Sequence, residues 1–214
     1  MNIDEFIEYL DSENSIRVGW GSESIDTSFE TMPCEFIKYA EIDLKSNMEH
    51  KYINALSNAK RALDCQADRF MKLFGFYEES QNKRWGFPAK VEMIQKFEII
   101  TPRVLSKINK KRNLMEHQYI KPQQEQVEDF IDIVNLFLLS TDKYVNNFVK
   151  KVDYLNEIDN KYENLAEIQF VINSITSEIL ISDYSDNLIN IKISKNDNRY
   201  IDILKRHIKK IQTY

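Results

Sequence analysis

Four residues within one eight-residue segment carry side chains suited to proton transfer beside a phosphate. They are Arg112, Asn113, His117 and Tyr119, in the sequence RNLMEHQY. A guanidinium binds a phosphate through two parallel hydrogen bonds, and an imidazole exchanges its proton near neutral pH. The chain has three histidines, and the other two lack such neighbours. We therefore expect any chemistry of this protein in this segment.

Helical periodicity places Arg112 on an otherwise apolar face of a helix. The other members of that face are Leu105, Ile108, Met115 and Tyr119. A guanidinium on a buried face costs free energy unless an anion or hydrogen-bond acceptors meet it. Two explanations stay open: an internal ion pair, for instance with Glu128 or Asp132, or a cleft or partner subunit in which Arg112 binds phosphate.

Asn113 and His117 are four residues apart, so they share a helix face and Asn113 can orient the imidazole. Arg112 and His117 point about 140° apart on a helix of 3.6 residues per turn. One copy of the chain would therefore bring them together poorly. Two copies related by a dimer axis would do so better, which predicts half of a site in each copy.

The charge of the surrounding segment differs from that of the rest of the chain. The net charge is -5, from 29 basic and 34 acidic residues. Residues 101–121 hold six basic residues against Glu116 alone, a net charge of +5, which leaves -10 for the remainder. The basic residues are Arg103, Lys107, Lys110, Lys111, Arg112 and Lys121. Such a segment is typical of a confined anion site, although a solvated helix face explains the charge as well.

Composition indicates a helical protein of the cytoplasm. Among 214 residues there are only 4 Gly and 4 Pro, which favours long helices over a turn-rich β fold. The two cysteines have no metal or redox spacing, and we expect a reduced cytoplasmic compartment. No apolar run reaches the length of a membrane span. Glycine-rich phosphate loops and metal-ligand clusters are absent from the sequence, so we expect neither cofactor nor metal.

Apolar periodicity predicts a mainly α protein: a helical bundle followed by a small C-terminal α+β appendage. We expect helices over residues 2–11, 52–74, 89–97, 123–149 and 199–211, and a further helix that begins at Thr101-Pro102. A loop is expected over residues 12–33. Strands are expected over residues 167–172, 177–184 and 187–194. The domains would be an N-terminal helix and loop (1–34), a helical domain (35–150) and the C-terminal region (155–214). The helix that begins at Thr101-Pro102 would carry the RNLMEHQY segment.

The segment resembles the signature of the HEPN superfamily, in which Arg, often followed by Asn, precedes His by four to six residues. Arg112-Asn113-Leu114-Met115-Glu116-His117 is the form with four intervening residues. The resemblance covers about residues 35–150, where NALSNAKRALDCQADRFMKLFGF and the helix after Pro122 look like the helical bundle of the family.

The resemblance implies a homodimeric, metal-independent endoribonuclease of a toxin–antitoxin, antiphage-defence or RNA-processing system. Arg112, Asn113 and His117 would be catalytic, with RNA as the substrate and a cognate antitoxin or regulatory protein as a further partner. We expect Lys107, Lys110 and Lys111 to bind substrate phosphates. Tyr119 matches a tyrosine that is nucleotidylated in some toxins of the superfamily, but its apolar face favours a core or interface aromatic.

Two other functions fit the same sequence. The domain could be a non-catalytic HEPN module that binds a nucleotide, RNA or a protein partner, because the acidic remainder of the chain is poorly suited to general RNA capture. The C-terminal region could instead carry the main role, since its alternating strands offer an edge for pairing with a partner.

Overall fold

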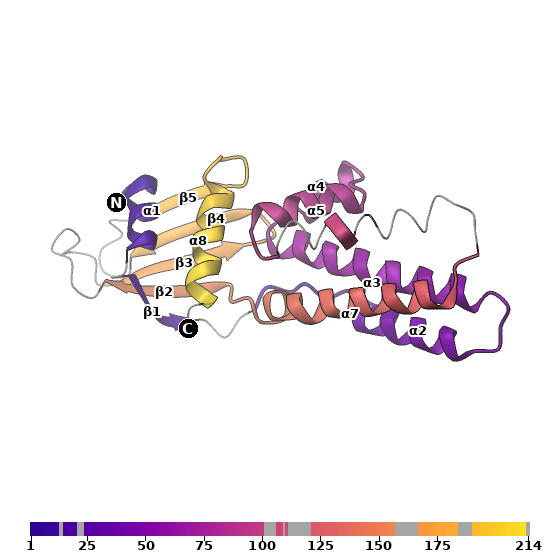
Figure 1. The fold of residues 1–214 in the computed structure, drawn as a ribbon. Helices are drawn as coiled ribbons and strands as arrows, with labels where there is room; N and C mark the ends of the chain where they lie inside the picture. The colour runs from indigo at the N-terminus through magenta and orange to yellow at the C-terminus, as the bar shows by residue number, and fades with distance from the viewer. Residues whose placement is uncertain are drawn as a thin grey trace. The chain divides into compact units, whose positions relative to one another are not determined.

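The structure is a computed structural model in which the chain forms two compact units. It describes residues 1–12, 15–20, 24–100, 106–108, 110, 121–156, 167–183 and 190–212. The helical unit comprises residues 26–73 and 77–146. The sheet unit comprises residues 1–25, 74–76 and 147–214 (Figure 1). The helical unit is thus formed by two long insertions into the sheet unit.

The helical unit is built on an antiparallel pair of helices, α2 (Pro33–Lys45) and α3 (Lys51–Leu73). Pro33 begins α2 at a position where its missing N–H costs nothing. Every third or fourth residue of α3 is buried, including Ala59, Leu63 and Phe70. The amide of Asn58 donates to the Asp43 carboxylate at 2.8 Å, across the two helices. The pairing of α2 with α3 thus forms the first half of the helical unit, residues 33–73.

The short helices α4 (Tyr77–Asn82) and α5 (Phe87–Lys96) follow α3. The side chain of Lys90, 10% exposed, forms an ion pair with Asp68 of α3 at 2.6 Å. The predicted helix over 89–97 is confirmed, but it begins two residues earlier, at Phe87. The Phe87 side chain is buried. α5 is held to α3 by both an ion pair and apolar packing.

The long helix α7 (Gln124–Asn147) runs parallel to α3. Tyr52 donates a hydrogen bond to Gln124 near the start of both helices, and Gln66 donates one to Thr141 near their ends. The apolar periodicity of residues 123–149 predicts ten inward-facing residues, and all ten are buried. These buried residues are Val127, Phe130, Ile131, Val134, Phe137, Leu138, Thr141, Tyr144, Val145 and, just beyond α7, Phe148.

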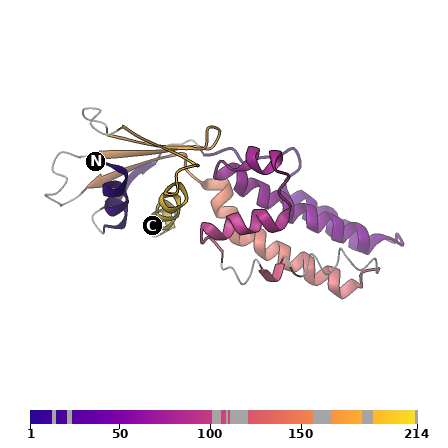
Figure 2. The same cartoon turned by 90° about the horizontal axis from the view of Figure 1, so that it is seen from above.

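The sheet unit holds a five-stranded antiparallel sheet in the order β1-β2-β3-β4-β5. Its strands are β1 (Ser15–Trp20), β2 (Lys151–Asn156), β3 (Glu167–Asn173), β4 (Glu178–Asp183) and β5 (Asn190–Ser194). Helices α1 (Ile3–Asp11) and α8 (Tyr200–Gln212) lie on one face of it (Figure 2). Alternate strand residues such as Tyr154, Phe170 and Ile181 are buried. One face of the sheet therefore forms the core with the two helices.

His207 of α8 lies in the middle of this core and is fully buried. Its Nδ1 atom is hydrogen-bonded to the hydroxyl of Tyr154 at 2.5 Å, and its ring stacks on Phe170 with centroids 4.2 Å apart. A histidine enclosed by aromatic rings on a helix of the core is a packing residue.

The predicted class, mainly helical with a smaller sheet, is confirmed, but two strands were missed. The prediction of a loop over residues 12–33 is wrong for residues 15–20, which form strand β1. Strand β2 was not predicted. β1 is a single short strand whose hydrogen-bonding partner is β2, with Ile16 opposite Leu155, far away in sequence. The structure divides the chain differently from 1–34, 35–150 and 155–214, because residues 1–25 belong with residues 147–214. The α+β part is therefore not a C-terminal appendage alone.

Gly75 lies where the chain cannot accept a side chain, and we expect Gly75→Ala to lower the free energy of unfolding by about 2–3 kcal/mol. Its φ is +76°, and an added Cβ would lie 2.8 Å from Oγ of Ser177, whose hydroxyl donates to the Gly75 carbonyl. The measurement is urea denaturation followed by circular dichroism. Gly86→Ala is the matched control, because Gly86 has a negative φ and its nearest atom is 3.7 Å away. Equal losses in both variants would contradict the prediction.

Candidate functional site

The whole of the predicted catalytic segment, RNLMEHQY, lies outside the described residues. Lys111, Arg112, Asn113, His117 and Tyr119 all fall within residues 111–120. Their mutual geometry, and the roles assigned to them, therefore stay predictions. The start of the predicted helix after Thr101-Pro102 also falls outside the described ranges.

Two of the predicted substrate-binding lysines are described. Lys107 and Lys110 are helical and exposed, whereas Ile108 between them is 2% exposed. A helix with one buried apolar residue and exposed lysines beside it matches the amphipathic pattern predicted for this part of the chain. The two ammonium groups are therefore accessible to an anion.

The chain leaves this segment beside the first turns of α3 and α7. Lys121 lies 3.6 Å from the carboxylate of Glu49, just before α3 begins, and both side chains are largely exposed. Tyr52 and Gln124 make their hydrogen bond at 2.7 Å in the same region. An exposed ion pair contributes little stability. It nevertheless locates the end of the basic segment at the amino-terminal ends of the two long helices.

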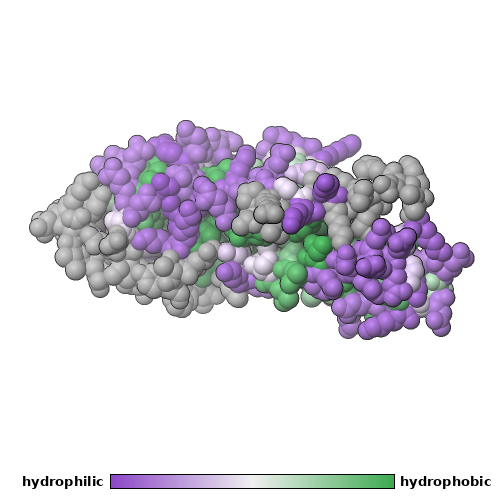
Figure 3. All heavy atoms as spheres, viewed as in Figure 1, coloured by the Kyte–Doolittle hydropathy of each residue, from purple (hydrophilic) through white to green (hydrophobic). Residues whose placement is uncertain are grey.

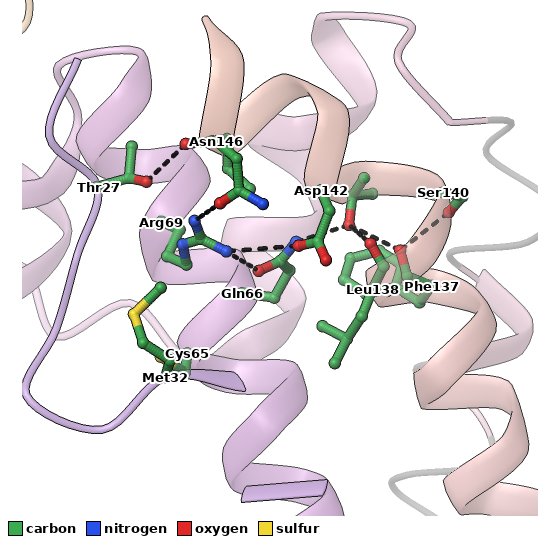
Figure 4. Close-up of polar contacts among 12 residues, drawn as sticks. Thr27, Met32, Cys65, Gln66, Arg69, Phe137, Leu138, Ser140, Asp142 and Asn146 are labelled. Atoms are coloured by element: carbon green, nitrogen blue, oxygen red, sulfur yellow. Dashed lines mark hydrogen bonds and ion pairs between the residues drawn. The ribbon is translucent and has the colours of Figure 1, made fainter. Parts of the chain in front are cut away.

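The described residues contain one buried polar cluster in the helical unit, centred on Arg69 of α3 (Figure 4). The Nη1 atom of Arg69 donates to the side-chain oxygen of Gln66 at 3.0 Å and lies 3.5 Å from the Asp142 carboxylate. Nη2 donates to the side-chain oxygen of Asn146. Gln66 in turn donates to Thr141, whose hydroxyl donates to the Phe137 carbonyl at 2.6 Å. The cluster joins the ends of α3 and α7.

The electrostatic balance of the cluster is unusual for a buried arginine. Arg69 is 3% exposed, and burial lowers the pKa of its guanidinium below the ordinary value, against the opposing effect of Asp142. The carboxylate of Asp142 is 43% exposed and only at the limit of hydrogen-bonding distance. Neutral amide oxygens therefore provide most of the acceptors, and the Nε atom has no acceptor among the described residues. Such a cluster positions helices; it contains no nucleophile or proton donor suited to catalysis.

The cluster could have been anticipated from the sequence, but only in part. Gln66 and Arg69 fall on the same helix face as Ala59, Ala62 and Leu63, where apolar residues would be expected. Their polarity on that face was the available signal. The identity of their partners on α7 depends on how the two helices pack, which periodicity does not encode.

Cys65 lies beside this cluster (Figure 4). It is half-buried, its thiol donates to the Thr31 carbonyl at 3.6 Å, and burial raises its pKa to about 11. Since the thiolate is the reactive form, Cys65 is poorly suited to act as a nucleophile at neutral pH.

The described part of the chain lacks both a metal-binding cluster and a membrane-spanning helix. No group of three or more His, Cys, Asp or Glu side chains there could hold a metal ion. Within the same residues, no helix has the length and apolar composition needed to cross a membrane.

Comparison of the chain with protein-family models, with curated proteins and with solved structures found no match.

Replacing Arg69 by alanine removes the donor that joins Gln66 to Asn146, so we expect Arg69→Ala to lower the free energy of unfolding by about 2–4 kcal/mol. Arg61→Ala is the matched control, because Arg61 is an exposed arginine of the same helix, and its loss should stay within about 0.5 kcal/mol. Urea denaturation measures both. Comparable losses would show that the cluster does not stabilise the unit.

The two thiols should react at different rates with iodoacetamide. With a pKa of about 11, roughly one Cys65 thiol in a thousand is ionised at pH 8, and its labelling rate should rise with pH toward that value. Cys34 is exposed and should be labelled at least about tenfold faster at pH 8. Mass spectrometry of Cys34→Ser and Cys65→Ser measures each rate separately. Equal rates in the two variants would contradict the burial of Cys65.

Proposed function

We propose that this protein is a metal-independent endoribonuclease of HEPN type, with an active site completed in a homodimer. The observation that carries the proposal is the spacing of Arg112, Asn113 and His117 in a segment of net charge +5. The position of this segment, between α5 and α7 of the helical unit, supports a helical-bundle context for it. The finer assignment of the bundle to the HEPN superfamily is part of the proposal.

In the proposed reaction the ribose 2′-oxygen attacks the adjacent phosphorus and the bond from phosphorus to the 5′-oxygen breaks. His117 of one copy takes the 2′-hydroxyl proton, and His117 of the second copy donates a proton to the leaving 5′-oxygen. Arg112 binds the phosphate oxygens and stabilises the charge that accumulates on them. Asn113 orients the imidazole. The products are a 2′,3′-cyclic phosphate and a 5′-hydroxyl, and neither water nor metal enters the balance.

The neighbouring lysines would bind the RNA strand on either side of the scissile bond. Lys110 and Lys111 follow Lys107 by three and four residues, a spacing that would put all three on one side of a helix. The exposure of Lys107 and Lys110 supports this role, because their ammonium groups reach solvent. Phosphate contacts of this kind add affinity without selecting a sequence.

A toxin or defence role, controlled by an antitoxin or regulatory protein, belongs to the same proposal and rests on the family resemblance. Tyr119 is the residue that such a partner would modify. The competing function is a non-catalytic module that binds nucleotide, RNA or a protein. It is favoured by the net charge of -10 outside residues 101–121, which repels extended RNA.

The test is cleavage of a single-stranded RNA by the purified full chain in the presence of EDTA. We expect cutting to leave a cyclic phosphate, to spare DNA of the same sequence, and to fall at least about 100-fold in His117→Ala and Arg112→Ala. His50→Ala and Arg61→Ala are the matched controls, because both residues are exposed and lie outside the segment. These two variants should retain activity.

Cleavage that requires Mg²⁺, or that is unchanged in His117→Ala and Arg112→Ala, would overturn the proposed mechanism. If no RNA is cut, fluorescence anisotropy with the same RNA decides for the second function. Binding that weakens in Arg112→Ala but not in Arg61→Ala would establish a non-catalytic module.

A further inference from the structure

α7 exposes a second, outward-facing stripe opposite its buried face. The stripe consists of Asp129, Asp132, Leu136, Leu139 and Lys143, all of which are exposed. Leu136 is 67% exposed and Leu139 is 74% exposed, among the most exposed large apolar residues described. Figure 3 shows hydrophobic surface gathered over α7. Two neighbouring exposed leucines on the outer side of a helix that is already apolar inside indicate a surface for a further partner.

The spacing of the stripe is that of a helix-pairing seam. Its five members follow one another in steps of three, four, three and four residues, the repeat that keeps one helix face against another. From Asp129 to Lys143 the stripe is about 21 Å long at 1.5 Å per residue. The seam therefore extends over about four turns, with its two leucines near the centre.

The order of residues along the seam makes it complementary to itself. If a second α7 lies antiparallel across a two-fold axis between residues 137 and 138, Leu136 faces Leu139 of the second copy. In the same register Asp132 faces Lys143, and each pair occurs twice. A two-fold interface requires this kind of self-complementarity, in which residue i meets j and j meets i. Apolar contacts at the centre are then flanked by opposite charges.

We propose that α7 is a self-association surface at which two copies of this chain pair antiparallel through Leu136, Leu139, Asp132 and Lys143. Tyr39 and Ile42 form another exposed apolar pair, on α2, without this arrangement of flanking charges. Two-fold pairing there through Tyr39 and Ile42 would place Glu35 opposite Ser46, with no opposite charge. Self-association through α7 is independent of RNA cleavage, because it rests on residues outside the basic segment.

A single pair of helices buries less surface than a standard stable interface, so the dissociation constant should lie at about 1–100 μM. Sedimentation equilibrium of the full chain between 1 and 300 μM measures it. The double variant Leu136→Glu/Leu139→Glu should raise the constant at least tenfold. Ile42→Glu on α2 is the matched control and should leave it unchanged, since Ile42 is 57% exposed. Circular dichroism checks that each variant is folded, as expected for exposed positions.

Charge reversal tests the two-fold register itself. Asp132→Lys would place two lysines opposite each other, and Lys143→Asp two aspartates, so each single variant should raise the dissociation constant about threefold or more. The double variant Asp132→Lys/Lys143→Asp restores opposite charges and should return the constant to near the wild-type value. Only an interface in which these two positions face each other predicts this restoration.

Three results would overturn the proposal: a monomer at 300 μM, a dimer that Leu136→Glu/Leu139→Glu leaves intact, or a dimer that Ile42→Glu disrupts instead. Failure of the double charge reversal to restore association would exclude the two-fold register. A monomer at 300 μM would also remove the homodimer that the proposed function requires, whereas a dimer that survives Leu136→Glu/Leu139→Glu, with RNA still cut, would overturn the α7 surface alone.

Discussion

The helical unit depends on the pairing of α3 with α7 through the buried Arg69 cluster. Apolar side chains alone allow two parallel helices to slide by a turn, since one apolar residue replaces another at small cost. Gln66, Arg69 and Thr141 do not allow this, because a shifted helix would leave buried polar atoms without partners. A fully buried Gln66 that bonds to Thr141 therefore selects one axial register. Burial of the Arg69 guanidinium costs free energy, but it restricts the two helices to this register.

This register has consequences along the whole of α7. With its inner residues directed at α3, the helix turns the stripe containing Leu136 and Leu139 outward. The same alignment brings Gln124 to Tyr52, and so sets where the basic segment rejoins the bundle. The buried contact between Gln66 and Thr141 thus fixes which face of α7 is exposed, and it fixes where the chain re-enters the bundle after residues 101–121.

The sheet unit obeys a different constraint, since its strands come from both ends of the chain. Strands β2 to β5 follow one another, and each pairs with its neighbour in sequence. β1 instead pairs with β2 from the opposite terminus, and the short segment around Gly75 contributes a turn bonded to Ser177. Contacts this distant in sequence explain why the predicted boundaries of an N-terminal region and a C-terminal appendage did not hold. The unit therefore combines residues 1–25 with residues 147–214.

The sequence by itself determined the features that depend on neighbouring residues. These are the extents of α1, α3, α5, α7 and α8 and the spacing of Arg112 and His117. They also include the ten inward-facing residues between Val127 and Phe148. These follow from 3.6-residue periodicity and short-range turn signals. Only the tertiary structure decided that residues 15–20 form a strand, that His207 is a core residue, and that Arg69 is bound by α7. Each of these depends on partners that lie 53 to 141 positions away in the chain. Periodicity records which face of an element is apolar, but the partner that covers that face is selected by packing.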